Sequence, residues 1–147
     1  LSFGTRYGIE REYCFDDYDG LLNCSEVDVI YIATPHPSHF KIALAAAKSH
    51  KHMLIEKPMA MTEKQVQFIF DAAHQYNVFV MEAYMYRCHP LTIKIIEMIN
   101  SDAIGKVNMI SASFSFDGRS LGSESRLWRN ELGGGALMDI GGCKCDT

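Results

Sequence analysis

The sequence lacks the features that would place it quickly in several classes of protein. Its five cysteines are odd in number and irregularly spaced, which argues against a disulfide framework and fits a reducing compartment. Lys and Arg number 14 against 18 Asp and Glu, and the net charge of −4 gives no basic surface for nucleic acid or anionic lipid. No apolar run approaches the roughly 20 residues of a membrane span. We therefore expect a cytoplasmic protein whose partners include neither nucleic acid nor membrane.

A phosphate-binding glycine turn is also missing. No G-x-G-x-x-G occurs, and the run at 133–135 lacks a correctly spaced third glycine and follows no predicted parallel strand. The chain begins without Met and ends on Gly-Gly-Cys-Lys-Cys-Asp-Thr. We expect the 147 residues to be a fragment of a longer protein, and we expect them to fold poorly and to be inactive alone.

What the chain does contain is a strand–helix–strand pattern within a composition that is 48% apolar. Short β-branched and apolar runs alternate with helical patterns, which predicts βαβ units with right-handed crossovers and a parallel sheet buried on both faces. The clearest helix follows Thr62 and Gln65, whose spacing is that of a capping box, and Ser38 is the expected cap of the helix before it. The predicted strands are 27–33, 52–56 and 78–84.

The pattern changes near residue 85. A short helix is predicted over 91–100, and apolar residues then alternate with polar ones over 107–116, as in a strand of an antiparallel sheet. We therefore predict an α/β chain with two incomplete domains. Residues 1–84 form part of a doubly wound Rossmann sheet, and residues 85–147 begin a second α/β domain with an open, largely antiparallel sheet.

Glu56-Lys57-Pro58 follows the second predicted strand. Proline cannot donate to a strand ladder and favours extended geometry in the residue before it, so Lys57 is expected at the carboxyl edge of the sheet, where such sheets bind ligands. A lysine in a dry pocket or beside a cationic ring suits general acid–base work. The spacing is also compatible with an ordinary solvated lysine.

The loop Thr34-Pro35-His36-Pro37-Ser38-His39 follows the first predicted strand and is expected at the same edge. Two prolines make it rigid, which suits contact with a flat ring. The H-x-x-H spacing of His36 and His39 is also typical of a zinc site. However, His50 and His52 are expected at the opposite end of the strands, where they are poorly placed to complete such a site.

Three further groups come later in the chain. Arg87 follows the third strand and has the fork geometry for a phosphate, carboxamide or hydroxyl. Asp139 follows the glycine run and suits a buried carboxylate that accepts a substrate hydroxyl, although a solvated helical aspartate fits the spacing too. Trp128 and Arg129 fit either the cover of an active site or the anchor of a loop.

Five motifs taken in order resemble the Gfo/Idh/MocA oxidoreductases, and they span nearly all of the chain. They are ATPHPSH at 33–39, EKP at 56–58, EAYMYRCHP at 82–90, SRLWR at 125–129 and GGGALMDIG at 133–141. EAYMYRCHP and GGGALMDIG are most similar to the dihydrodiol dehydrogenases and glucose-fructose oxidoreductases within that family. The resemblance implies an NAD- or NADP-binding Rossmann domain, followed by a domain whose open sheet is often the interface of a homo-oligomer.

The resemblance also implies roles for individual residues. Lys57 matches the lysine that hydrogen-bonds the reacting oxygen, as principal acid/base, and Asp139 matches the aspartate that orients substrate and supports proton transfer. No metal is required. The implied reaction moves a hydride between nicotinamide and a carbinol carbon of a sugar, polyol or dihydrodiol. The implied cofactor-lining residues are Thr34, Pro35, His36, His39, Glu56, Lys57, Pro58, Glu82, Arg87, Trp128 and Arg129.

Two departures from the family pattern matter. The family usually has His or Tyr four residues after the aspartate, where this chain has Cys143, and we interpret the last residues as damaged or truncated sequence. The glycine-rich first strand and the residue that selects NAD over NADP are also absent. These departures leave a leading rival interpretation, a non-catalytic Rossmann-like binding or regulatory module. A third interpretation is a metal hydrolase that uses His36 and His39.

Overall fold

The computed structural model describes residues 2–141, which form two compact units that divide between Glu82 and Ala83. The first unit holds the strands. In chain order its elements are α1 (Ser2–Tyr7), the 3-10 turn η1 (Arg11–Tyr13), α2 (Tyr18–Asn23), β1 (Val29–Ile32), α3 (His36–Lys48), β2 (His52–Ile55), α4 (Glu63–Gln75) and β3 (Val80–Glu82).

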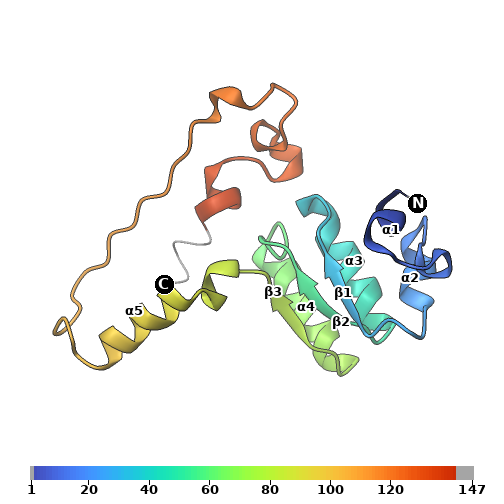
Figure 1. Ribbon diagram of the computed structural model, residues 1–147, viewed down its shortest axis with the longest axis horizontal. Coiled ribbons are helices and arrows are strands. Elements are labelled where there is room, and N and C mark those ends of the chain that lie inside the picture. The colour runs from blue at the N-terminus through green and yellow to red at the C-terminus, as the bar shows by residue number, and fades with distance from the viewer. Residues whose placement is uncertain (1, 142–147) are drawn as a thin grey trace. The chain divides into compact units, whose positions relative to one another are not determined.

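The three strands form one parallel sheet in the order β1-β2-β3. Ile30 pairs with Met53 and Met53 pairs with Val80, so β2 is the central strand. Helices α3 and α4, which connect the strands, lie on one face of this sheet (Figure 1). The predicted βαβ pattern is therefore confirmed, with each strand shorter than its apolar run.

The core fills the space between the sheet and these two helices. Ile32, Met53 and Ile55 are almost fully buried from the strands, and Ile69 meets them from α4. The expectation of strands buried on both faces is wrong for the described residues, because alternate positions such as Val29 and Tyr31 are exposed. Successive crossovers of one hand place both connecting helices on the same side, which leaves the other face of the sheet without a helix from these βαβ units.

The two long helices begin differently. Thr62 caps α4 as predicted, since its hydroxyl accepts from Gln65 N at 3.3 Å, while the Gln65 side chain accepts from Met61 N at 3.0 Å. The prediction that Ser38 caps α3 is wrong. That helix begins at His36, and Pro37 lies in its first turn, where a proline loses no helical hydrogen bond.

The second unit has helices and turns. Its elements are the 3-10 turn η2 (Met85–Cys88), α5 (Pro90–Asn100), the 3-10 turns η3 (Gly118–Ser120), η4 (Arg126–Trp128) and η5 (Asn130–Leu132), and the π-helical turn η6 (Leu137–Gly141). Helix α5 confirms the helix predicted over 91–100, and the His89 side chain caps it by accepting from Leu91 N at 3.1 Å.

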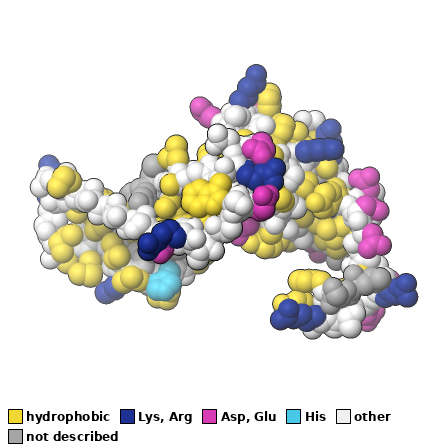
Figure 2. All heavy atoms as spheres, turned by 90° about the horizontal axis from the view of Figure 1, so that it is seen from above, with side chains coloured by type: hydrophobic (Ala, Val, Ile, Leu, Met, Phe, Trp, Pro, Cys, Tyr) yellow, Lys and Arg dark blue, Asp and Glu magenta, His cyan; other side chains and the backbone are white. Residues whose placement is uncertain are grey.

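The strand predicted over 107–116 is not formed, and the described residues contain no antiparallel pair of strands. Alternation of apolar side chains suits a strand, but a strand exists only where another backbone completes its hydrogen bonds. Met109, Phe114 and Phe116 are more than half exposed in this segment. Hydrophobic side chains reach the visible surface in several places (Figure 2). Within residues 2–141, no helix is both long enough and apolar enough to cross a membrane.

Candidate functional site

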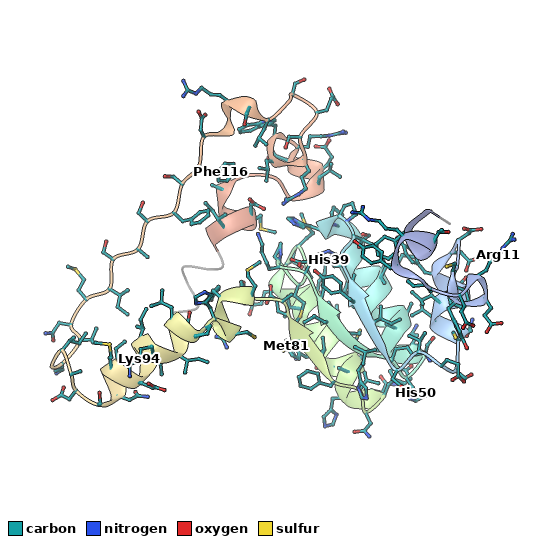
Figure 3. All side chains as sticks on the ribbon, viewed as in Figure 1. Arg11, His39, His50, Met81, Lys94 and Phe116 are labelled. Atoms are coloured by element: carbon teal, nitrogen blue, oxygen red, sulfur yellow. The ribbon has the colours of Figure 1, made fainter. Side chains whose placement is uncertain are left out.

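The predicted residues of the first unit gather at the carboxyl edge of its sheet. The strands are parallel, so the segments that follow β1 and β2 and the last residue of β3 reach the same edge. Thr34 and Pro35 follow β1, Lys57 follows β2, and Glu82 ends β3. His39 lies near this edge and His50 lies at the opposite end of the sheet, as expected (Figure 3).

His39 lies beneath these loops and has no exposed surface. Its Nε2 lies 2.7 Å from the carbonyl oxygen of Thr34, and its Nδ1 lies 2.9 Å from that of Pro58. Zinc would need a ring-nitrogen lone pair, whereas both nitrogens of His39 face main-chain oxygens. His36, on the same helix, is 6% exposed. His39 therefore joins the loop after β1 to the turn after β2.

Glu56 faces Tyr31, a residue that the sequence analysis did not single out. The Tyr31 hydroxyl donates to Glu56 Oε1. This hydrogen bond is the main cause that raises the pKa of Tyr31 above its ordinary 10.0, and burial and the carboxylate charge add to it. The one signal for Tyr31 was a hydroxyl-bearing side chain in an otherwise aliphatic strand.

Lys57 and Pro58 are half-buried, and the peptide bond between them is cis. The next residue, Met59, is 3% exposed, and its N–H donates to Glu82 Oε1 at 2.8 Å. The carboxylate that the family resemblance assigns to the cofactor thus binds the main chain of the turn after Lys57. The turn that follows Lys57 is therefore hydrogen-bonded to both α3 and β3.

In the second unit, SRLWR packs against the glycine run. Gly134 N donates to the Arg129 carbonyl at 3.0 Å, and Gly135 N donates to the Leu127 carbonyl at 2.9 Å. Arg126 donates to Asp139 Oδ1 at 2.7 Å, and the Asp139 side chain is only 13% exposed. Arg126 is the partner of Asp139 that the sequence analysis missed, although it belongs to a motif already recognised.

A hollow of about 250 Å³ lies beside Asp139, within the second unit. Its walls are mainly apolar and include Phe114, Phe116, Trp128 and Ile140. An apolar hollow with one carboxylate suits a small molecule whose polar group is fixed by that carboxylate. Asp139 therefore lines this hollow.

The remaining predicted residues of the second unit are more exposed. Arg129 pairs with Glu131 at 2.7 Å, and this hydrogen bond lowers the pKa of the Glu131 carboxyl. Arg87 lies in η2 and is exposed. Cys143, the position that departs from the family pattern, lies outside the described residues.

The residues at the sheet edge suit one end of a dinucleotide. The Thr34 hydroxyl and the Lys57 ammonium provide hydrogen-bonding groups, and the proline that follows each stiffens its loop. This chemistry fits the hydroxyls and carboxamide of a nicotinamide riboside. The sequence has no glycine turn for the pyrophosphate, so the fit extends to the nicotinamide end only.

Comparison with known families gives two matches along the chain. The family described as "Oxidoreductase family, NAD-binding Rossmann fold" matches residues 2–84. The family described as "GFO/IDH/MocA C-terminal domain" matches residues 92–146.

Individual relatives agree with these matches. A trans-1,2-dihydrobenzene-1,2-diol dehydrogenase of Danio rerio is 37% identical, over 95% of this chain and 40% of its own length. A D-xylose 1-dehydrogenase (NADP(+)) of Haloferax volcanii is 34% identical, over 96% of this chain and 40% of its own length. The crystal structure of KijD10, a 3-ketoreductase of Actinomadura kijaniata in complex with NADP and TDP-benzene, aligns with a TM-score of 0.83 at 29% identity, covering 95% of this chain and 42% of that one. The chain therefore spans about 40% of the length of the relatives it matches.

Proposed function

We propose, from the premise that this chain belongs to the GFO/IDH/MocA oxidoreductase family with its NAD-binding Rossmann fold, that the full-length protein is an NAD- or NADP-dependent dehydrogenase. Its substrate class is a sugar, polyol or dihydrodiol, and the reaction moves a hydride to or from a carbinol carbon. The relatives named as diol and xylose dehydrogenases support this substrate class.

The sheet edge of the first unit is the proposed cofactor side. Thr34, Pro35, Lys57 and Pro58 would hold the nicotinamide end through their hydroxyl, ammonium and rigid ring surfaces. The nicotinamide, when bound, supplies the hydride chemistry, and the protein supplies orientation and the proton. His36, Arg87, Trp128 and Arg129 remain proposed cofactor contacts on the family resemblance.

Lys57 is the proposed acid/base residue. Its ammonium group donates a hydrogen bond to the reacting oxygen and gives up or takes back a proton there as that oxygen changes between hydroxyl and carbonyl. This role requires a fixed position for the lysine more than a particular neighbour. The observation that carries the proposal is that Lys57 stands at the carboxyl edge of a parallel sheet, in a turn hydrogen-bonded to two neighbouring elements.

Asp139 is the proposed orienting group for the substrate. Its carboxylate accepts a hydrogen bond from a substrate hydroxyl, and Arg126 fixes the direction of that carboxylate. The extended residues 107–116 are proposed to join a largely antiparallel sheet whose other strands belong to the rest of the full-length protein. That sheet is the proposed interface between copies of the protein.

The test replaces Lys57 in the full-length protein. Lys57→Ala is expected to lower kcat at least about 100-fold, because a positioned general acid–base group contributes on this scale. Lys41→Ala, an exposed lysine on α3, is the matched control and is expected to leave kcat unchanged. Turnover is measured with NADH, NADPH and their oxidised forms against sugars, polyols and dihydrodiols.

Two outcomes would count against the proposal. If Lys57→Ala turns over at the rate of the unmodified protein, Lys57 is not the acid/base residue. If the unmodified protein shows no hydride transfer across the whole substrate panel while it still binds a nicotinamide cofactor, the binding or regulatory module becomes the better interpretation.

A further inference from the structure

We propose that Glu82 and His39 are positioning residues that together fix the orientation of one peptide group, the one between Pro58 and Met59, and through it the place of Lys57. This inference rests on the proposed acid/base role of Lys57. It differs from the family-based expectation, which assigned Glu82 and His39 to direct contact with the cofactor.

The first contact comes from β3. Glu82 ends that strand opposite Ile55, the last residue of β2, in the parallel register. From there its side chain reaches forward to the turn, where Oε1 accepts from Met59 N at 2.8 Å. Because Met59 is almost fully buried, its N–H would otherwise lack a partner, and a buried donor without a partner is costly.

The second contact comes from α3, the helix that connects β1 to β2. His39 Nδ1 lies 2.9 Å from the Pro58 carbonyl oxygen, and its Nε2 lies 2.7 Å from the Thr34 carbonyl oxygen. The fully buried ring therefore links the turn to the end of β1. Packing on every side leaves the imidazole little freedom to release either oxygen.

The two contacts meet on a single rigid group. The Pro58 carbonyl and the Met59 N–H belong to the same planar peptide unit, so holding both ends fixes the rotation of that plane. Lys57 is joined to this peptide unit through Pro58, so the backbone position of Lys57 depends on the orientation of that unit. The arrangement sets the position of the lysine through backbone geometry, with no contact between the Lys57 ammonium and Glu82 or His39 required.

A role through geometry predicts that Glu82 needs its acceptor oxygen and not its charge. Glu82→Gln keeps an oxygen for Met59 N–H, whereas Glu82→Ala removes it. In the full-length protein without cofactor, hydrogen exchange of the Met59 amide is expected to accelerate at least about fivefold in Glu82→Ala, the factor that corresponds to losing one ordinary hydrogen bond. Exchange in Glu82→Gln is expected to match the unmodified protein within about twofold.

Kinetics on the same proteins give the second readout. Glu82→Ala is expected to lower kcat at least tenfold while the KM for the cofactor changes less than threefold, since misplaced catalytic groups cost rate more than binding. Glu82→Gln is expected to restore kcat. Asp17→Ala is the matched control, because Asp17 also accepts a main-chain N–H, that of Gly20 at 2.6 Å, but in the cap of α2. It is expected to lower the melting temperature and leave kcat unchanged.

The outcomes separate this inference from the proposed function. If Lys57→Ala loses activity but Glu82→Ala keeps full kcat and normal Met59 exchange, the positioning role is overturned and the proposed function stands. If Glu82→Gln raises the cofactor KM as much as Glu82→Ala does, Glu82 contacts the cofactor directly and the inference fails. If Lys57→Ala is fully active, the proposed function fails, and Met59 exchange still decides whether Glu82 holds the turn.

Substitutions of His39 test the positioning role independently of Glu82. The milder variant, His39→Gln, keeps the test valid even if His39→Leu does not fold. His39→Gln keeps an N–H donor for a main-chain carbonyl, whereas His39→Leu keeps the approximate volume and removes the polar nitrogens. We expect kcat to fall in the order unmodified protein, His39→Gln, His39→Leu, with the cofactor KM changed less than threefold in any variant that folds. A dominant rise in cofactor KM in His39→Gln would instead assign the imidazole to the cofactor.

Discussion

Arg126 donates to the carboxylate of Asp139 at 2.7 Å and so connects the 3-10 turn η4 to the π-helical turn η6. The Asp139 side chain is 13% exposed and that of Arg126 is 42% exposed, so the pair is shielded on the carboxylate side. A charge-assisted hydrogen bond of this kind fixes the direction of the carboxylate. Two motifs that are separate in the sequence thus form one local structure around the hollow.

This pair is expected to show coupling in a double-mutant cycle. Arg126→Met and Asp139→Asn are each expected to lower the free energy of unfolding. The double variant is expected to lose about 1 kcal/mol less than the sum of the two single losses. Because Arg126 is partly exposed, the expected coupling free energy is smaller than that of a fully buried pair. Urea unfolding of the full-length protein measures the cycle.

The control pair for that cycle is Arg119 with Asp117. They form an ion pair at 2.8 Å in the same unit, but their side chains are 92% and 59% exposed. Arg119→Met and Asp117→Asn are expected to have additive effects, because solvent screens such a pair. Equal coupling in the two cycles would contradict a special role for Arg126.

The pair of Tyr31 and Glu56 predicts a pH dependence. Because the pKa of Tyr31 is raised in the folded protein, folding favours the neutral phenol. The stabilisation is fully present below the ordinary pKa of 10.0 and is lost as pH rises through the raised value. The difference in tyrosinate absorbance between the unmodified protein and Tyr31→Phe isolates this titration.

Removal of Glu56 identifies the cause of that shift. Glu56→Ala is expected to move the Tyr31 midpoint back toward 10.0, since the carboxylate is the hydrogen-bond acceptor and the nearby charge. Glu63→Ala, which removes an exposed carboxylate from the first turn of α4, is expected to leave the midpoint in place. A midpoint that is unaffected by Glu56→Ala would show that the carboxylate does not set it.

Local patterns were sufficient to predict the alternation of strands and helices in the first unit. The capping box of Thr62 and Gln65 and the spacing of Ile69 and Ala73 specify α4 through contacts within a few residues. Once helices and strands alternate, handedness and parallel pairing follow from general rules. Lys57 was placed at the correct edge for the same reason, because the proline that follows it limits the strand.

Contacts between distant residues could not be predicted in this way. The spacing of His36 and His39 indicates one face of a helix, but it does not show that the Thr34 and Pro58 carbonyls meet at His39. Glu82 was recognised by its motif, and only the sheet register places it against Met59. The alternation over 107–116 was interpreted as a strand, yet pairing depends on a partner that no local pattern specifies.

The central strand is expected to dominate stability of the first unit. Ile55 has no exposed surface and lies between the core and the lysine turn. Ile55→Ala is expected to cost about 2–5 kcal/mol of unfolding free energy, and Ile55→Val about 0.5–1.5 kcal/mol, from lost burial and the cavity left behind. Ile104→Ala, at a position 64% exposed, is the control and is expected to change little. Similar losses in Ile55→Ala and Ile104→Ala would contradict this core.

Gly134 is expected to tolerate no side chain, because three backbone oxygens surround its α-carbon. A Cβ there would lie 2.5 Å from the Arg126 carbonyl oxygen and 2.8 Å from those of Leu127 and Arg129. None of these atoms moves without opening the turn that brings Arg126 to Asp139, so Gly134→Ala is expected to cost about 1–3 kcal/mol and to lower kcat. Gly122→Ala is the matched control, because a Cβ at Gly122 meets nothing within 4 Å. Thermal unfolding and turnover of the two full-length variants measure the difference, and equal melting temperatures would show that the SRLWR turn does not close on Gly134 in solution.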